Sequence, residues 1–333
     1  MTATTAPAAP RGLTSRGPVN PWVRFLARRL FRFAASLLGL MVMAFVLIQL
    51  IPGDPARNSL GITASAQSVA QRRVELGLDK SLLDQFGHFV GGVFTGDLGT
   101  SFNLGLPVSE IIGQRWAETA RLAVLAFLLA VVVAVPLGAA IAAATSGGRR
   151  RFLDMAFTSV TGLAYSIPGF LLAVGLSYVF AVRMKLLPIA GTDTVSGYVL
   201  PVIALAVGPA AALARIVRLE TLRVLGEDFV RTARSKRLPT LRVFLRHVIP
   251  NTLTPTLSMG GLMLGGLLAG TILVETIFVL PGLGSTLTQS VTTKDYPMVQ
   301  ALVLVTGGAV LLINLVVDML IAVADPRSTI LEG

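Results

Sequence analysis

A densely charged stretch lies between Glu227 and Pro250 of this strongly apolar chain. Acidic residues open a short helical pattern there and basic residues close it, which is the order that a helix macrodipole favours. Pro239 then ends the pattern, because proline cannot continue a helix. The stretch predicts a short amphipathic helix and a basic turn, whose residues are Glu227, Asp228, Phe229, Val230, Arg231, Thr232, Ala233, Arg234 and Arg237.

Two interpretations of this helix are open. A solvated basic loop would only fix the orientation of the chain in a membrane. An amphipathic helix would instead dock onto a partner, and its small apolar stripe consists of Phe229, Val230 and Ala233. Because orientation alone does not require these three residues in helical register, the sequence favours a docking helix.

The residue types give little support for ATP binding, thiol chemistry or metal binding by this chain. The glycine-rich phosphate loop that ends in Gly-Lys-Ser or Gly-Lys-Thr does not occur, so we expect no ATP bound in that manner. Cysteine is absent, which excludes disulfides and thiolate ligands. His88 and His247 lie far apart in the sequence and have no ligand-like neighbours. We therefore expect no metal site, no cofactor and no enzymatic activity in this chain.

Three polar residues lie in or beside apolar runs, where such groups usually face a cavity or a partner. Asn314 and Asp318 stand one helical turn apart. They are either part of a translocation path or gate, or an anchor to a basic group such as Arg215 or Arg121, and the anchor is favoured for Asp318. Glu275 precedes a Pro-Gly turn. It either lines the outer mouth of a pore or ties that turn down.

The composition is that of a polytopic membrane protein. Of the 333 residues 53% are hydrophobic and only 14% are charged, against about 25% in soluble domains. The net charge of +11 lies in patches beside apolar runs, which indicates membrane orientation rather than nucleic-acid binding. No aromatic-interleaved basic groove accompanies it. The lipid bilayer is therefore the expected partner of this charge, and nucleic acid is not.

The apolar runs predict six membrane spans in an all-α protein. A disordered cytosolic tail over 1–29 precedes them, and a cytosolic C-terminus over 325–333 follows them. The second to sixth spans form one core domain over 119–324. The predicted spans are 30–51, 119–145, 153–182, 197–216, 252–275 and 299–323.

The connections between the spans predict the orientation of the chain. Lys and Arg are concentrated in 1–29, 146–152 and the loop 217–250, which places these segments and both termini in the cytosol. The segment 52–118 has nearly balanced charge and belongs outside. Helical periodicity within it predicts short helices near 66–76, 81–94 and 107–117.

Several motifs occur in a fixed order along nearly the whole chain, from about residue 24 to 328. They are Leu50-Ile-Pro-Gly-Asp-Pro55, Gly96-Asp-Leu-Gly-Thr-Ser101, Ser166-Ile-Pro-Gly-Phe170, Pro281-Gly-Leu-Gly284, Asn314-Leu-Val-Val-Asp318 and Asp325-Pro-Arg327. With them the chain resembles the integral-membrane permease subunits of ABC importers of the oligopeptide and dipeptide type. The long outer segment after the first span resembles that of the first of the two paired permeases.

The resemblance implies a type I ABC permease fold in a bacterial-type plasma membrane. It implies a second homologous permease, two ATPase subunits that hold ATP and magnesium, and an extracytoplasmic substrate-binding protein as partners. Di- and oligopeptides are the implied substrates. Nickel complexes, glutathione and other small solutes are alternatives in the same family. A stand-alone secondary transporter is the alternative from another class.

The resemblance also names the cytosolic loop as the contact with the ATPase. The family's triplet stands here as Arg231-Thr232-Ala233, and its later apolar group as His247-Val-Ile-Pro250. The glycine that the family places between them is replaced by Arg237. A left-handed arginine costs roughly 1 kcal/mol. Either the loop turns differently, with Pro239 as its stop, or Arg237 adopts the strained conformation.

Overall fold

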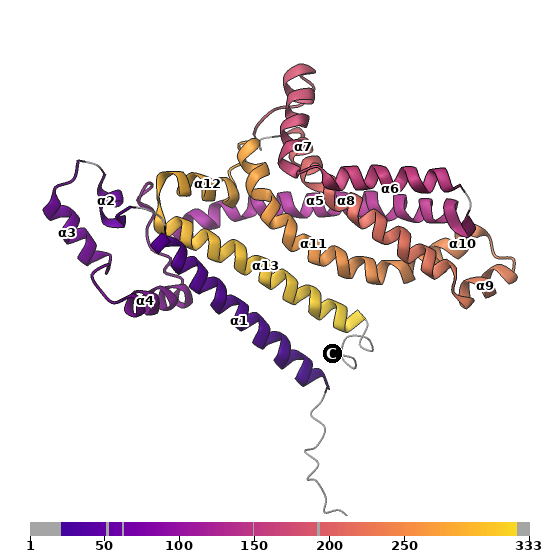
Figure 1. Cartoon of the computed structure of the whole chain (residues 1–333), viewed down its shortest axis with the longest axis horizontal. Helices are drawn as coiled ribbons and strands as arrows, with labels where there is room; N and C mark the ends of the chain where they lie inside the picture. The colour runs from indigo at the N-terminus through magenta and orange to yellow at the C-terminus, as the bar shows by residue number, and fades with distance from the viewer. Residues whose placement is uncertain (1–20, 51–52, 62, 149, 192–193, 325–333) are drawn as a thin grey trace, which may run out of the picture.

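The computed structural model describes residues 21–50, 53–61, 63–148, 150–191 and 194–324. Its long helices lie alongside one another (Figure 1), and each contains a stretch long and apolar enough to cross a membrane. The described residues contain no β-strand, so the prediction of an all-helical membrane protein is confirmed. These helices are α1 (Pro21–Leu50), α5 (Val108–Thr145), α8 (Val195–Leu225), α11 (Ile249–Ile277) and α13 (Tyr296–Ala324).

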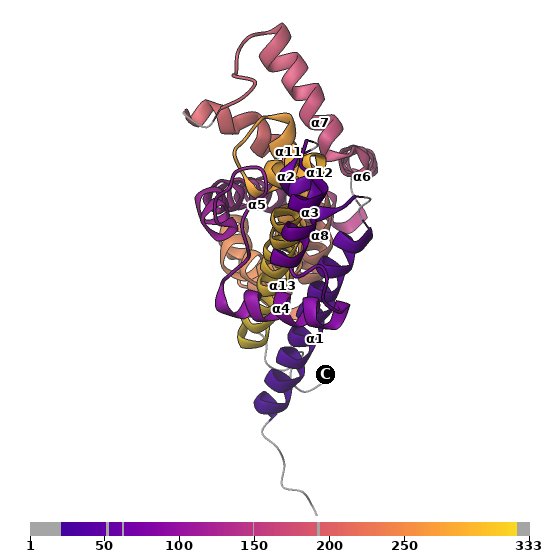
Figure 2. The same ribbon diagram turned by 90° about the vertical axis from the view of Figure 1, so that its left-hand side faces the viewer.

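The predicted third span, 153–182, corresponds to a bent pair of helices that together are long and apolar enough for one span. α6 (Arg151–Ser166) is followed by α7 (Gly169–Leu176), which continues as a π-helical turn over Ser177–Arg183, and the two directions differ by 91°. Ile167 is extended because it precedes Pro168, and the proline cannot continue α6. α7 consequently projects away from the bundle (Figures 1 and 2).

The core lies between α5, α8 and α11. Leu122 and Ala126 of α5 pack there against Leu200 of α8 and Phe278 at the end of α11. Small residues let the helices approach closely. A Cβ atom on Gly138 of α5 would lie 2.5 Å from the carbonyl oxygen of Ala214 in α8. Close packing of backbones therefore replaces bulky side chains in this part of the bundle.

Short helices gather at the two ends of the bundle. At one end are α2 (Pro55–Leu60), α3 (Ala66–Glu75), α4 (Leu82–Thr95) and α12 (Leu283–Thr293), and Figure 2 looks onto α2, α3 and α4. At the other end are α9 (Asp228–Ser235) and α10 (Thr240–Val243) (Figure 1), and a π-helical turn over Phe244–Val248 joins α10 to α11. The predicted cytosolic loop and the predicted outer segment thus lie at opposite ends.

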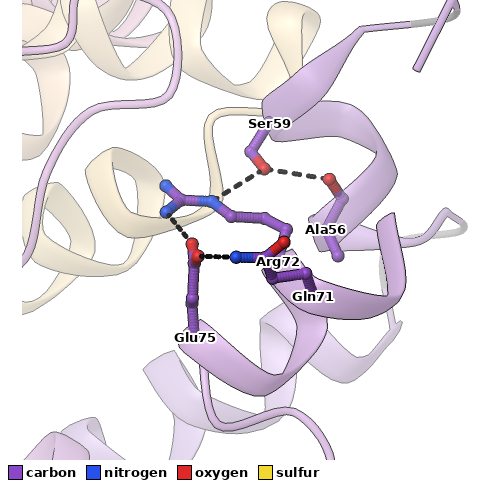
Figure 3. Close-up of polar contacts among 5 residues, drawn as sticks. All are labelled: Ala56, Ser59, Gln71, Arg72 and Glu75. Atoms are coloured by element: carbon purple, nitrogen blue, oxygen red, sulfur yellow. Dashed lines mark hydrogen bonds and ion pairs between the residues drawn. The ribbon is translucent and has the colours of Figure 1, made fainter. Parts of the chain in front are cut away.

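Polar contacts hold α2 and α3 together. Arg72 donates to the hydroxyl of Ser59 at 3.4 Å and to the carboxylate of Glu75 at 3.0 Å (Figure 3). Asp54 caps α2 through the amide of Ala56 and pairs with Arg73 at 2.8 Å. Partial burial raises the pKa of Asp54, but the hydrogen bonds from Arg73 and the Ala56 amide outweigh it, and the pKa lies below its usual range.

Asp295 ties the rest of the outer segment to the bundle. This buried residue immediately precedes α13, and its carboxylate accepts hydrogen bonds from the Ser101 hydroxyl and from the amides of Phe102 (3.1 Å) and Asn103 (3.3 Å). The loop that carries the Gly96–Ser101 motif is thereby fixed against the start of the last span.

The helices differ in extent from the sequence predictions. α1 begins nine residues before the predicted span, within the part expected to be a disordered tail, because arginine supports a helix well. The short helix near 107–117 and the second span form one helix, since nothing between them breaks it. α8 continues beyond residue 216 to Leu225. Residues 1–20 and 325–333 lie outside the described part.

Candidate functional site

The predicted helix in the cytosolic loop is present as α9. Asp228 lies in its first turn and Arg234 in its last, so the charges follow the predicted order along the helix dipole. Glu227 is the N-cap residue, and its carbonyl oxygen accepts from the amides of Val230 (3.1 Å) and Arg231 (3.2 Å). Its side chain makes no capping hydrogen bond.

The apolar stripe of α9 is divided between two environments. Val230 and Ala233 are buried and pack against Val224 and Leu225 at the end of α8, together with Val243 and Val248. Phe229 is 43% exposed. Two residues of the predicted stripe therefore hold α9 on its own chain, and only Phe229 is left exposed to a partner.

The exposed surface of the loop combines apolar and basic groups. Besides Phe229, two apolar side chains that follow α9 in the sequence are exposed, Leu241 (70% exposed) and Leu245 (62% exposed). The side chain of Arg231 is 73% exposed, and its contact with Asp228 at 3.4 Å lies on the surface. Thr232, Arg234 and Pro250 are also exposed. We call the group Phe229, Arg231, Leu241 and Leu245 the loop surface.

Arg237 adopts the left-handed conformation that a glycine would favour. Its φ is 53°, and its amide donates to the carbonyl oxygen of Arg234 at 2.9 Å. Of the two alternatives for this position, the structure shows the strained arginine. Leu238 is then carried back into the cluster around Val230, and Pro239 precedes α10.

Replacing Arg237 with glycine is expected to be neutral or to stabilise the protein by up to about 1 kcal/mol, because it removes the left-handed strain. Thermal unfolding of the purified complex measures this effect. Lys236→Gly is the matched control, since Lys236 has a φ of −75° and offers no strain to relieve. A large loss of ATPase coupling in the Arg237→Gly variant would show that the arginine makes a specific contact.

Glu275 closes a polar cluster at the opposite end of the bundle. It is 1% exposed, and its carboxylate accepts from the Thr119 hydroxyl of α5 at 2.7 Å. It also accepts from the backbone amides of Gly284 (2.7 Å) and Ser285 (3.1 Å). The Thr119 hydroxyl in turn accepts from the amide of Leu283 at 2.8 Å. Of the two roles considered for Glu275, these contacts are those of a residue that ties the turn down.

The Pro281-Gly-Leu-Gly284 turn has the two glycines that this clamp requires. A Cβ atom on Gly282 would lie 2.3 Å from the carboxyl carbon of Glu275, and one on Gly284 would lie 2.4 Å from the Cα atom of Ile272. The first turn of α12 therefore lies directly on the end of α11. Helix α12 and the contact between Thr119 and Glu275 were missed by sequence reasoning, since nothing in the pattern pairs residues so far apart.

Asp318 is an anchor, but to a different arginine from those expected. It forms an ion pair with Arg29 of α1 and not with Arg215 or Arg121. Arg121 pairs instead with Glu118 at 3.0 Å and donates a hydrogen bond to the Tyr198 hydroxyl at 3.0 Å. The pair between Arg29 and Asp318 joins the first and last spans, which lie side by side.

Asn314 lies one helical turn from Asp318 on α13 but far from Glu275. Its side chain faces Gly265 of α11, where a Cβ atom would lie 3.2 Å from the Asn314 Oδ1 atom. That oxygen has no hydrogen-bond partner among the described residues. Gly265 precedes Glu275 by ten residues of α11, or about 15 Å along the helix. Glu275, Asn314 and Asp318 therefore do not form one site.

Comparison with known proteins identifies the family. Residues 134–330 match the family described as binding-protein-dependent transport system inner membrane component, and residues 22–123 match the N-terminal model of the same component. The chain belongs to this family. It is an inner-membrane permease of an ABC importer of the peptide type, which confirms the family resemblance and places it as a multi-pass protein of the plasma membrane.

Two curated relatives of this permease align over most of both chains. A glutathione transport system permease protein of Pectobacterium atrosepticum is 40% identical over 304 residues, which are 91% of this chain and 98% of that one. A probable peptide ABC transporter permease protein of Sinorhizobium fredii is 35% identical over 311 residues, with the same coverage. Among solved structures, an amino acid ABC transporter is 18% identical, with a TM-score of 0.47 and coverage of 66% of this chain and 94% of that one.

Proposed function

We propose that this permease imports short peptides, with glutathione among them, and that a separate ATPase drives it through the loop surface. The relatives named for glutathione and for peptides support the substrate class, since glutathione is itself a tripeptide. Within the proposal, ATP and magnesium are held by two ATPase subunits. A substrate-binding protein delivers the peptide to the outer end, where the segment 52–118 lies.

The observation that carries the ATPase contact is the division of α9 between a buried and an exposed side. Val230 and Ala233 attach the helix to α8, so force on the helix is transmitted to a span. Phe229 and Arg231 are both exposed on α9. Aromatic residues and arginine are enriched in protein–protein interfaces, so their exposure here is consistent with a partner contact.

The bent third span supports a second, homologous permease as a partner. α7 and the π-helical turn after it project from the bundle and expose Phe170, Leu171, Val174 and Tyr178. A groove of about 470 Å³ lies at the base of α7, between Tyr165, Pro168, Gly208 and Gly266. A second permease packed on α7 would cover the apolar side chains and enclose this groove as part of a path between the two subunits.

A secondary transporter is the competing function. The energy source of uptake, ATP or a proton gradient, distinguishes the two. Such a transporter needs intramembrane proton or sodium ligands, but Asp318 is paired with Arg29 and Glu275 is bonded to Thr119 and two amides. We expect uptake of labelled glutathione and dipeptides into proteoliposomes holding the complete complex to persist when the proton gradient is collapsed and ATP is held constant. Loss of uptake under these conditions would favour the secondary transporter.

A further inference from the structure

The helix α4 has an apolar side that the rest of the chain covers only in part. Seven of its fourteen residues are Leu, Val or Phe, and at 3.6 residues per turn they fall within an arc of about 140°. None of its residues is buried. Leu82 is 60% exposed, Leu83 84% and Phe94 76%. A helix of this composition is not stable against water on its apolar side, so something else covers it.

The contact of α4 with α1 fixes its depth. Phe86 and Phe89 pack on Phe45 of α1, with ring centroids 5.4 and 6.3 Å apart. Phe45 lies five residues before Leu50, the last described residue of α1. At 1.5 Å per residue this places α4 about 7.5 Å below the end of α1. Figures 1 and 2 show α4 beside that end of the helix.

The basic residues of α1 locate the membrane surface near Leu50. Arg32 is the last arginine of α1, and a span needs about 20 apolar residues, which sets the outer boundary close to residue 52. The apolar side of α4 thus lies at the depth of about 5–10 Å that amphipathic helices reach in a membrane interface. Met43 and Val46 of α1, exposed on the span at the same level, continue this surface.

The polar side of α4 faces a different environment. Asp84, Gln85, His88 and Thr95 line a cavity of about 670 Å³, which Phe89, the end of α1, α3 and the start of α13 also border. Asp84 and His88 are the only ionisable residues of the helix. Water in this cavity would solvate the polar side of α4, and lipid beneath the helix would cover its apolar side.

We propose that α4 is a membrane-interface helix, which lies in the outer leaflet with Leu82, Leu83 and Phe94 among lipid chains and its polar side towards water. It supports the outer segment on the bilayer beside α1. The inference depends on α1 as a span and not on the substrate or the ATPase contact, so it stands or falls independently of the proposed function.

Site-directed labelling of the full complex tests this position. This chain has no native cysteine, so with cysteine-free partner subunits each introduced cysteine is the single labelled site. An environment-sensitive fluorophore is attached to Leu83→Cys, Phe94→Cys or His88→Cys in phosphatidylcholine–phosphatidylglycerol nanodiscs that contain a doxyl-labelled lipid. Met43→Cys on α1 and Gln67→Cys on α3 are the lipid and water controls, since both side chains are exposed.

We expect the labels at positions 83 and 94 to lose as much fluorescence to the doxyl lipid as the label at position 43. The label at position 88 should be quenched by aqueous iodide, as at position 67. Equal access of iodide to positions 83, 94 and 88 would overturn the proposal. Shielding of positions 83 and 94 that develops only after the substrate-binding protein is added would also overturn it, in favour of a protein docking surface.

Discussion

Uptake driven by ATP is expected to be lost when Phe229→Asp and Arg231→Glu are combined. Both side chains are exposed on the loop surface, and residues that dominate a protein–protein contact contribute about 2–4 kcal/mol each to binding. The buried Val230 and Ala233 are untouched, so α9 stays attached to α8. The affinity for the ATPase should therefore fall by at least about 30-fold. Uptake and co-purification of the ATPase from membranes measure the two effects.

A charge change alone does not explain this expected loss. Arg223→Glu is the matched control, because Arg223 has a side chain 76% exposed at the end of α8 and lies outside α9. It introduces the same charge as Arg231→Glu and should leave uptake intact. The repulsion between the glutamate introduced at position 231 and Asp228 costs only about 0.2–0.5 kcal/mol, too little to unfold the helix. If uptake and co-purification both survive in the double variant, the loop surface is not the ATPase contact.

The parts of this permease that sequence predicted are those that depend on local patterns. Apolar runs located the spans because every backbone polar group in a bilayer must be bonded within its own helix. The break at Ser166-Ile-Pro-Gly169 was visible because a proline restricts the residue before it, although its 91° bend was not. Arg237 was recognised as a problem from one residue type, and its φ of 53° shows the strained alternative.

The parts that sequence missed depend on which helices are neighbours. Asp318 was expected to meet a basic group, but only the packing of α1 on α13 selects Arg29. Similarly, an apolar stripe shows that α9 is covered on one side without showing by what. Val230 and Ala233 face their own chain and Phe229 does not, because the end of α8 reaches one edge of the stripe only.

Replacing Glu275 with alanine is expected to produce the largest loss of stability of any single change at the outer end. The variant leaves the Thr119 hydroxyl and the amides of Gly284 and Ser285 without their acceptor in a buried place. An unsatisfied buried donor costs about 1–3 kcal/mol, so the total should be about 3 kcal/mol or more. Thermal unfolding of the detergent-purified complex measures the change, and protease sensitivity of the α11–α12 turn localises it.

Glu275→Gln separates a structural clamp from a pore residue. Glutamine can keep its oxygen on the amides of Gly284 and Ser285, but its NH2 group then replaces the oxygen that accepts from the Thr119 hydroxyl, so a clamp should lose part of its stability. A residue that only lines a pore would instead change substrate affinity and leave unfolding unaltered. An alanine variant as stable as the parent would contradict the clamp directly.

Variants of Thr119 test the hydrogen bond between Thr119 and Glu275 more directly. The Thr119 hydroxyl donates to Glu275 and accepts from the Leu283 amide, so it joins α5 to both sides of the turn. Thr119→Val removes this link with little change of shape, and Thr119→Ser retains it as a control. Because the two residues share one hydrogen bond, the effects of Thr119→Val and Glu275→Ala should not add, and the double variant should be more stable than their sum by about 0.5–3 kcal/mol. Strict additivity would mean that the two residues act separately, and the outer end would then lack the three-way contact that holds α12 against α5 and α11.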